Sequence, residues 1–400
     1  MQNNRFQSSI LSIPIILSLQ GVMIPLSYAE ITLDGTLGHN GLLAGPDFVI
    51  PAEAGKQLGD NLFHSFGVFD VDTGESATFT GPNSVHHILG RVTGGSRSTI
   101  DGLLRSEIPG ANLYLINPAG MMFGPHAELN VQGSFHTGTA DFIRLGENGR
   151  FDATHPENSV LAIAPPSAFG FLGENPTGIS IEQSRLGVEA GKTLSLVGGD
   201  IKMVGGTLSA PSGRINMSSA TSKGEVTSDT SHLATESFNK FGKIDITQEA
   251  KVEVSGGGGE SIFIRGGIFT LSADSGINTS TASTDPASNI SIIITDSVSI
   301  SDGSKVESTT KGQGDAGDLS ITAGTLEIGN GAVINASTSS TGKGGDLSVE
   351  ADHVLLSGNG VKDAGTGIVS QALGSGDAGF LSFKAGTLEI RNGAFISGDT

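Results

Sequence analysis

Four aspartates in the C-terminal half are the side chains of this sequence best suited to chemistry. Carboxylates that converge in one groove, often with calcium or a basic side chain, can cleave polysaccharides by acid–base catalysis. These are Asp315, Asp318, Asp346 and Asp377, and each directly follows a glycine. Aspartate beside glycine is typical of tight turns, where the short carboxylate bonds to nearby backbone N–H groups. We therefore interpret the four as turn residues and predict that the chain is not an enzyme.

Two further patterns are tested as metal sites. Residues 256–264 (GGGGESIFI) resemble one calcium-binding nonapeptide, but that motif works in tandem and needs aspartate where Ser261 stands. His86 and His87 are adjacent, and successive side chains of a strand point to opposite faces, so they do not converge on one ion. The sequence has no cysteine, phosphate-binding loop or nucleophile-elbow motif. We predict no metal and no cofactor.

The composition shows what kind of fold must position these residues. The chain has 60 glycines in 400 residues, no Trp, and only 16% charged residues, which is unusual for compact globular domains. Its 36% hydrophobic content, however, is more than disordered chains carry. The net charge is −19, whereas proteins that bind nucleic acids need basic surfaces to contact the phosphates. We therefore predict no nucleic-acid partner. The chain must fold with small side chains and many turns.

The first 29 residues are typical of a signal peptide. Arg5 is the only charged residue before Glu30, residues 10–19 are apolar, and Ser27 and Ala29 are small residues at the positions that precede a cleavage site. Pro14 and Gly21 interrupt the apolar stretch, which is too short for a permanent anchor of about 20 residues. We predict cleavage between Ala29 and Glu30 and export of the mature chain to the periplasm and beyond.

Beyond this segment the pattern favours many short strands. Residues 99–104, 113–116, 194–197 and 244–246 are strand-like pieces between turn signals. The C-terminal half also repeats itself: the 25-residue stretches that begin at Gly314 and Gly376 agree at 17 positions. Degenerate copies begin at residues 242, 289 and 342, so the unit is about 30 residues, a period typical of solenoids.

Each repeat contains three apolar runs. In the clearest copy they are residues 319–321, 326–328 and 333–334, separated by polar turns at 323–325 and 329–331. Three short strands per coil, each paired with its equivalent in the next coil, predict an all-β, right-handed parallel β-helix, with a separation between coils of about 4.8 Å. A leucine-rich repeat would need several leucines at fixed spacing, and these copies offer glycine, serine and isoleucine instead.

The segment before the repeats carries more specific motifs. They are IPAEAGKQLGDNLFHSFGVFDV (50–71), ATFTGPNSVHHILGRVTGGSRSTIDGLL (77–104), ANLYLINPAGMMFGPHAELNVQGSFHTGTAD (111–141) and GKTLSLVGGDIKMVGGTLSAPSGRINMSS (191–219). In order and spacing this segment resembles the N-terminal haemagglutination-activity domain of filamentous-haemagglutinin-like, two-partner-secretion exoproteins. The resemblance covers about 190 residues. It implies a β-helix with extra-helical hairpins in the N-terminal part.

The hallmark of that family is a pair of Asn-Pro turns. The second is present as Asn117, Pro118, Ala119 and Gly120, with alanine where asparagine is more usual. The first is altered to Gly81, Pro82, Asn83 and Ser84. From the residues alone, the second motif is a type I turn that closes a hairpin, and the first makes an equally tight turn. The resemblance implies that the second motif contributes to secretion, and the alteration weakens that expectation for the first.

The resemblance also implies a partner and a destination. The implied partner is an outer-membrane β-barrel transporter, and the implied destination is the medium or the cell surface. Because a regular β-helix has long, flat polar faces, we further expect a monomeric rod that binds cell-surface or biofilm polymers. We predict three segments: the signal peptide (1–29), the secretion domain (30–220) and glycine- and serine-rich β-helical repeats (221–400). The last residues fall within a repeat, so we expect a truncated array.

Four functions compete at this point. The first is a secreted adhesin-like exoprotein, and the second is the stalk of a contact-dependent toxin or haemolysin whose payload is missing. The third is an autotransporter passenger, which would carry its own barrel of alternating strands of about ten residues each. The fourth is a polysaccharide-cleaving β-helix enzyme. We favour the first.

Overall fold

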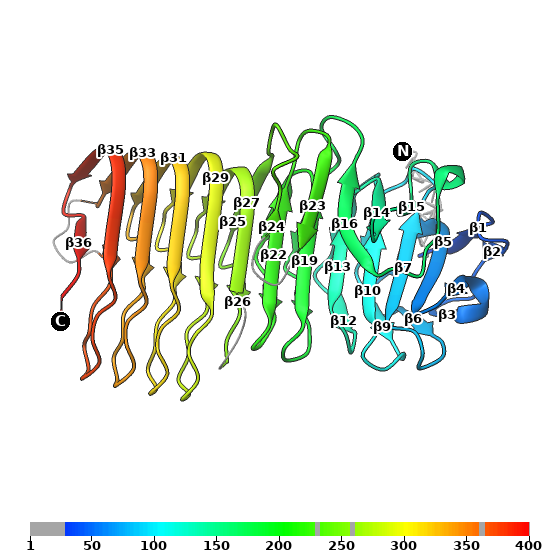
Figure 1. Cartoon of the computed structure of the whole chain (residues 1–400), viewed down its shortest axis with the longest axis horizontal. Helices are drawn as coiled ribbons and strands as arrows, with labels where there is room; N and C mark the ends of the chain where they lie inside the picture. Colours follow the sequence, from blue (N-terminus) through cyan, green and yellow to red (C-terminus); the bar gives the residue numbers. More distant parts are fainter. Residues whose placement is uncertain (1–28, 229–232, 257–260, 360–364, 400) are drawn as a thin grey trace, which may run out of the picture.

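The described residues form a rod built from β-strands. The computed structural model describes residues 29–228, 233–256, 261–359 and 365–399 (Figure 1). The predicted signal peptide falls outside these residues except for Ala29, so its cleavage stays a prediction. Within the described part of the chain, no helix has the length and apolar character needed to cross a bilayer.

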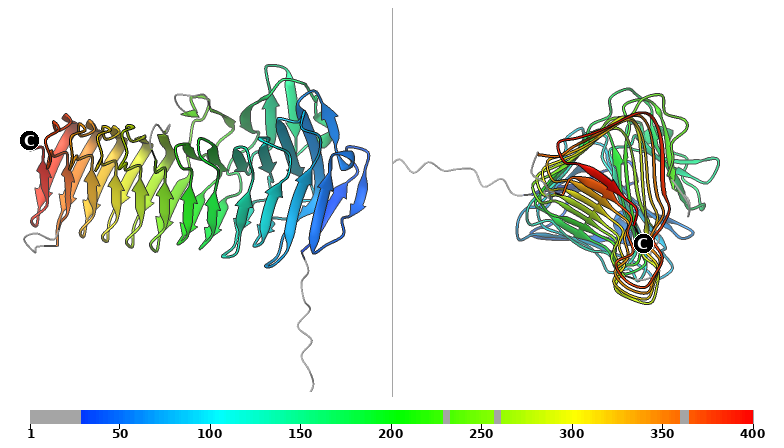
Figure 2. Two further views of the ribbon diagram at one scale, coloured as in Figure 1. Left: turned by 90° about the horizontal axis from the view of Figure 1, so that it is seen from below. Right: turned by 90° about the vertical axis from the view of Figure 1, so that its left-hand side faces the viewer.

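Three parallel ladders run along the rod and form its sides. Each strand pairs with the equivalent strand one coil further on, and the coils superpose in a view down the long axis (Figure 2). The predicted three-sided parallel β-helix is thereby confirmed. We call the ladders side 1, side 2 and side 3, in the order in which the chain visits them within a coil.

The strands of each side have the following bounds. Side 1 contains β5 (Asn61–Phe69), β7 (His87–Val92), β10 (Asn112–Ile116), β13 (Phe135–Gly138), β19 (Thr193–Gly198) and β22 (Arg214–Ser219). Side 2 contains β8 (Ser98–Ile100), β11 (Met121–Phe123), β17 (Ile179–Glu182), β20 (Ile201–Val204) and β25 (Lys243–Thr247). In the later coils one long strand spans sides 1 and 2: β27 (Ser261–Leu271), β29 (Asn289–Ile300), β31 (Leu319–Gly329), β33 (Leu347–Ser357) and β35 (Leu381–Arg391). Side 3 contains β3 (Asp47–Pro51), β6 (Ser76–Thr80), β9 (Leu103–Ser106), β12 (Glu128–Asn130), β18 (Arg185–Gly187), β21 (Thr207–Ser209), β26 (Lys251–Glu253), β28 (Gly276–Asn278), β30 (Lys305–Glu307), β32 (Val333–Asn335), β34 (Gly367–Val369) and β36 (Phe395–Ser397).

Two predicted local boundaries are wrong. The turn expected at residues 323–325 lies inside β31, because the ladder to β33 continues on both sides of Gly324 while the strand bends there. A side chain at Gly324 would lie 2.6 Å from the Asp296 carbonyl, so glycine avoids a close contact here, although the next coil has Asp352 at the equivalent position. Conversely, the single strand expected at 99–104 is two strands, β8 and β9, because the chain turns a corner at Gly102.

The coil length explains the repeat seen in the sequence. Ser291 pairs with Ser320, Ser320 with Ser348, and Ser348 with Ser382, so one coil advances the sequence by 29, 28 and 34 residues. Ser320 and Ser382 are two coils and 62 residues apart, which is the separation of the two closest sequence copies.

The interior of the rod is a continuous apolar column. In the repeats it is built from single isoleucine, leucine and valine side chains, because alternate residues of each strand point inward. In the first coils phenylalanine takes over: Phe66, Phe69 and Phe79 are fully buried and contact one another edge-on or stacked, with ring centroids 4.9–6.4 Å apart. This end of the rod is covered by antiparallel pairing of β1 (Ile31–Asp34), β2 (Asn40–Leu42) and β4 (Lys56–Leu58) around β5, next to the short 3-10 helix η1 (Ala52–Ala54).

A second sheet lies outside the rod in its N-terminal half (Figure 2). It is antiparallel and contains β14 (Phe142–Leu145), β15 (Gly149–Asp152), β16 (Pro166–Phe171), β23 (Gly224–Ser228) and β24 (Leu233–Ala234), with the 3-10 helix η2 (Pro156–Asn158) after β15. We call it the outer sheet. Its residues Phe151 and Phe169 pack with the outward-facing Phe63 and Leu89 of side 1 in a second hydrophobic core. The extra-helical hairpins that the sequence predicted are thus confirmed.

Arg91 joins the outer sheet to the rod. This β7 residue is 1% exposed, and its guanidinium lies 4.4 Å from the centre of the Phe151 ring. It donates hydrogen bonds to Ser65 Oγ (2.7 Å), to the Asp152 carbonyl (2.5 Å) and to Thr36 Oγ1 (2.8 Å). Burial lowers its pKa to about 10, which leaves the group charged at neutral pH. One buried cation therefore connects side 1, the N-terminal cap and the outer sheet.

His64 is a buried titratable group in the first coil. Its side chain faces inward between Phe66 and Phe79, and neither ring nitrogen has a hydrogen-bond partner. Burial lowers its pKa from 6.5 to about 3, because the charged imidazolium is disfavoured in this apolar surrounding. Below pH 6.5 the unfolded chain therefore binds a proton that the folded chain does not.

We expect the free energy of unfolding to fall by about 2 kcal/mol between pH 7 and pH 5 on account of His64 alone. The loss continues toward pH 3, since the depressed pKa keeps the folded state unprotonated until then. The measurement is urea unfolding of the wild type and of His64→Leu at both pH values, with the exposed His86→Leu as control. If His64→Leu has the same pH dependence as the wild type, this account of His64 is wrong.

Candidate functional site

The Asn-Pro motif forms the corner between side 1 and side 2 in the third coil. Residues 117–120 connect β10 to β11, and the Gly120 N–H donates to the Asn117 carbonyl (3.0 Å). The Asn117 side-chain oxygen also accepts the Ala119 N–H (2.9 Å). The tight turn is present, but the expectation that it closes a hairpin is wrong. β10 and β11 belong to different ladders and pair with neighbouring coils.

Asn117 is a structural residue of this corner. Its side chain is fully buried, and its amide donates to the Ser96 carbonyl (2.9 Å) and to Ser98 Oγ (3.0 Å) of the preceding corner. Only asparagine or glutamine has both the donors and the acceptor that these three bonds use. Pro118 and Ala119 are partly exposed, so they present the motif at the surface.

The same corner is bonded to the root of the outer sheet. Thr177 Oγ1 donates to the Pro118 carbonyl (2.6 Å), and Thr139 Oγ1 donates to the Thr177 carbonyl (2.6 Å). Thr139 precedes β14, and Thr177 lies between β16 and β17. Both excursions that build the outer sheet leave the rod between a strand of side 1 and a strand of side 2, as the motif itself does. The motif corner and the outer sheet are therefore one surface unit.

The altered first motif lies elsewhere. Residues 81–84 connect β6 of side 3 to β7 of side 1, and all four are exposed. The turn hydrogen bond runs from the Val85 N–H to the Pro82 carbonyl (3.1 Å), so the turn begins at the proline rather than before it. The structure thus places the two motifs on different corners of the rod and does not bring them together.

Three of the four aspartates of the repeats, Asp315, Asp318 and Asp346, form a staircase rather than a groove. Asp318 accepts the Asp346 N–H (2.9 Å), and Asp346 accepts the Phe380 N–H (2.9 Å), one coil further on. Asp315 accepts the Lys343 N–H (2.7 Å) in the same manner. The bond from the Phe380 N–H lowers the pKa of Asp346, and Lys343 adds to the effect. Each of these three carboxylates accepts a backbone N–H of the next coil, which explains why aspartate stands at these corners. Asp377 contributes its backbone carbonyl instead, which accepts the Gly344 N–H (2.8 Å).

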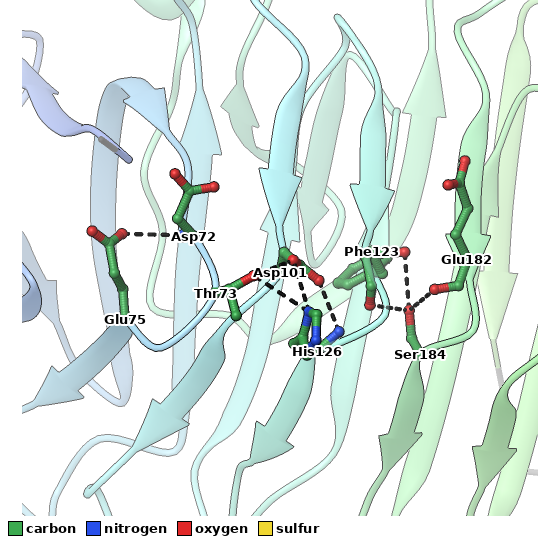
Figure 3. A network of polar contacts seen from close by, with 9 residues as sticks. Asp72, Thr73, Glu75, Asp101, Phe123, His126, Glu182 and Ser184 are labelled. Carbon is green, nitrogen blue, oxygen red and sulfur yellow. Dashed lines mark hydrogen bonds and ion pairs between the residues drawn. The ribbon is translucent and has the colours of Figure 1, made fainter. Parts of the chain in front are cut away.

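A second polar network spans the corner between sides 2 and 3, and sequence reasoning did not find it (Figure 3). Thr73 Oγ1 donates to Asp101 Oδ2 (2.5 Å), and His126 Nδ1 lies 3.1 Å from the same oxygen. The Thr73 hydroxyl lies 3.3 Å from that same His126 nitrogen. In a catalytic triad the hydroxyl and the carboxylate contact opposite nitrogens of the ring. This cluster therefore lacks the geometry of a nucleophilic triad and connects successive corners instead.

These residues lie on adjacent coils, so only the coil register would have grouped them in advance. Partial burial raises the pKa of Asp101, but hydrogen bonds from Thr73 and from the His126 backbone outweigh it, so that the pKa is lowered overall. A side chain at Gly124 would lie 2.3 Å from Asp101 Oδ1, so glycine is required next to this carboxylate.

The adjacent histidines point to different surroundings. His86 is exposed with Nδ1 3.2 Å from Asp60 Oδ2, whereas the His87 ring packs edge-on against Tyr114. Among the described residues, no three histidine, cysteine or acidic side chains are grouped as a metal site would require.

The chain is similar to known protein families and to individual proteins. A family model described as TPS secretion domain matches residues 29–262, more than half of the chain. Two relatives from Haemophilus influenzae, both named heme/hemopexin-binding protein, are 38% identical over 81 residues and 34% identical over 93 residues. These matches cover 20% and 23% of this chain but only 8% and 10% of the relatives, so the chain corresponds to a small part of them.

Two solved structures align with the chain. The crystal structure of the HMW1 secretion domain from Haemophilus influenzae aligns with a TM-score of 0.58 at 17% identity, covering 93% of this chain and 96% of that chain. The filamentous hemagglutinin secretion domain aligns with a TM-score of 0.42 at 15% identity, covering 92% of this chain and 100% of that chain. The first of these alignments shows a common fold.

Proposed function

The chain belongs to the TPS secretion domain family, and on this premise we propose that its N-terminal coils direct export through an outer-membrane β-barrel transporter of the two-partner type. Proteins with this domain are exported and secreted or surface-exposed. The observation that carries the proposal is the corner of residues 117–120, where a buried Asn117 holds Pro118 and Ala119 at the surface beside the root of the outer sheet. A recognition element needs such a rigid support.

The coils beyond the outer sheet support an adhesin-like role for the exported rod. On their outer faces Ser291, Ser320, Ser348 and Ser382 stand in register on successive coils. Such rows present evenly spaced hydroxyl groups, which suit polyhydroxylated polymers at cell surfaces or in biofilms. We propose that the secreted rod is a monomer that binds such polymers with these faces.

The export proposal is tested by co-expressing the full chain with a candidate transporter in a Gram-negative host. We expect the chain in the medium only when the transporter is present. Ala119→Glu places a charge on the exposed part of the motif corner and keeps the Ala119 N–H bond to Asn117. We expect it to lower export at least about tenfold, which corresponds to about 1.4 kcal/mol of binding free energy.

The matched control is Asn83→Glu, which places the same charge on the exposed first turn. We expect normal export and an unchanged melting temperature for this variant. Transporter-independent export of the wild type would overturn the proposal. Equal loss of export in both variants would show that recognition is not confined to the second corner.

A further inference from the structure

The outer sheet encloses a cavity against side 1. The cavity has a volume of about 290 Å³. Its inner wall comes from β10, β13 and β19 of side 1, and its outer wall comes from β14, β16 and β23 of the outer sheet. The export proposal makes no use of this space, because the motif corner of residues 117–120 does not line it.

The cavity walls are largely aromatic and aliphatic. Ile143, Phe169 and Val226 of the outer sheet face it and are buried. On the opposite wall the rings of Tyr114 and His136 stack with centroids 4.4 Å apart and planes 13° apart. Phe169 lies 6.3 Å from Tyr114, centroid to centroid, in a tilted arrangement. The cavity therefore offers aromatic side chains on both walls, against which a flat ring can pack.

Most polar side chains of the cavity lie on the inner wall, and Ser167 of β16 adds one to the outer wall. His136 Nδ1 lies 2.9 Å from Ser195 Oγ, which fixes the ring. The Tyr114 hydroxyl makes no hydrogen bond to any described residue, although burial raises the pKa of this group. Burial likewise lowers the pKa of His136 to about 3, so both groups are neutral at pH 7. Tyr114 is half-buried and lines the cavity, so a ligand with a hydrogen-bonding group can bond to its hydroxyl in place of water.

Size and charge narrow the ligand class. An apolar cavity of about 150 Å³ suffices to hold benzene, so this cavity has room for a molecule of one or two rings. Of the described residues that line it, none is acidic, which disfavours a cation. Arg214 also lines the cavity, with its guanidinium 5.2 Å from the centre of the Phe263 ring. We propose that the cavity beneath the outer sheet binds a small uncharged aromatic molecule that carries a hydroxyl or a similar hydrogen-bonding group.

The chain offers a direct probe of this site. It contains two tyrosines and no tryptophan, and the second tyrosine, Tyr28, lies within the predicted signal peptide. A mature chain that begins at Glu30 therefore reports by tyrosine fluorescence on Tyr114 alone. Benzyl alcohol is the probe, and cyclohexylmethanol, which has a similar size and the same hydroxyl but no aromatic ring, is the matched control. We expect benzyl alcohol to change Tyr114 fluorescence saturably and to raise the melting temperature, and cyclohexylmethanol to bind at least about tenfold more weakly.

Two variants locate the binding. Ala168 lines the cavity, and Ala168→Leu partly fills it, so we expect loss of benzyl alcohol binding with a melting temperature near that of the wild type. Tyr114→Phe keeps the ring and removes only the hydroxyl, and we expect about fivefold weaker binding by ligand-observed NMR, the contribution of one hydrogen bond. Absence of binding, equal binding of cyclohexylmethanol, or undiminished binding to Ala168→Leu would each overturn the proposal.

Discussion

Replacing Arg91 with methionine is expected to lower the free energy of unfolding by about 3–5 kcal/mol, because several buried hydrogen-bonding groups lose their partner at about 1–3 kcal/mol each. Methionine fills similar space, so the loss comes from the hydrogen bonds and not from a void. Without the guanidinium, the Asp152 carbonyl and the hydroxyls of Ser65 and Thr36 lose a partner. Asp34, which accepts bonds from Ser65 and Thr93, loses a nearby cation.

The loss of stability in Arg91→Met should be greatest in the N-terminal cap and the outer sheet. Because its partners lie in the N-terminal cap and the outer sheet, we expect hydrogen exchange to increase in residues 142–171 before it increases in the repeats. Arg91→Lys is the informative intermediate, since it keeps the charge but cannot bond to several partners at once. Arg185→Met, on an exposed residue of side 3, is the control. An outer sheet that stays protected in Arg91→Met would refute the anchoring role.

Replacing Asn117 with aspartate is expected to destabilise the motif corner by about 3 kcal/mol or more. Aspartate keeps the oxygen that accepts the Ala119 N–H, but it removes both hydrogen bonds that the amide donates and places a charge in a fully buried position. Asn117→Ala leaves three groups unpaired without adding a charge, so we expect a smaller loss, of about 2 kcal/mol. Urea unfolding of the purified mature chain is the measurement.

This pair of variants separates two roles of the motif. If Asn117 acts only by holding the corner, export through the transporter falls in proportion to the loss of stability. Asn117→Asp is then exported less than Asn117→Ala. If Asn117 itself contacts the transporter, both variants lose export equally whatever their stability. We expect the first outcome, since the side chain is fully buried. Ala119→Glu, which changes the surface only, provides the reference for lost recognition without lost stability.

The regular part of this fold could be predicted because its information is local and repeated. Apolar residues recur in each copy at the positions of Ile321, Ile328 and Ile334, and their spacing fixes three inward faces. Asn330 and Gly331 mark a corner by their positive φ values of 49° and 83°. The bend at Gly324 escaped prediction, because a turn and a bent strand place the same residue types in the same order. The difference lies in the pairing of β31 with β33 of the next coil, which continues on both sides of Gly324.

The parts that failed depend on contacts between distant residues. In the sequence Arg91 has the pattern of an exposed cation within a strand. It is buried because Phe151 and Asp152, about 60 residues later in the chain, pack over it. The outward-facing Leu89 carried a usable signal, since an apolar residue on the outer face of an alternating strand predicts a covering layer. The hairpin assigned to Asn117 was wrong for a related reason. A tight turn looks the same in sequence whether its strands pair with each other or with neighbouring coils.

The aspartate staircase gives the rod a direction. In each step the carboxylate belongs to the earlier coil and the N–H to the later one, from Asp318 to Asp346 and from Asp346 to Phe380. A folded coil thus holds an aspartate carboxylate in position as a hydrogen-bond acceptor. The next segment of the chain completes the bond by placing one backbone N–H beside it. When folding proceeds from the N-terminal end, each new coil finds the carboxylate acceptors of the preceding coil already in place. When folding proceeds from the other end, these acceptors are not yet positioned. Folding of the rod therefore has a preferred direction, from the N-terminal coils onward. Under mechanical load we expect the described coils to unfold one at a time, beginning with the most C-terminal coil.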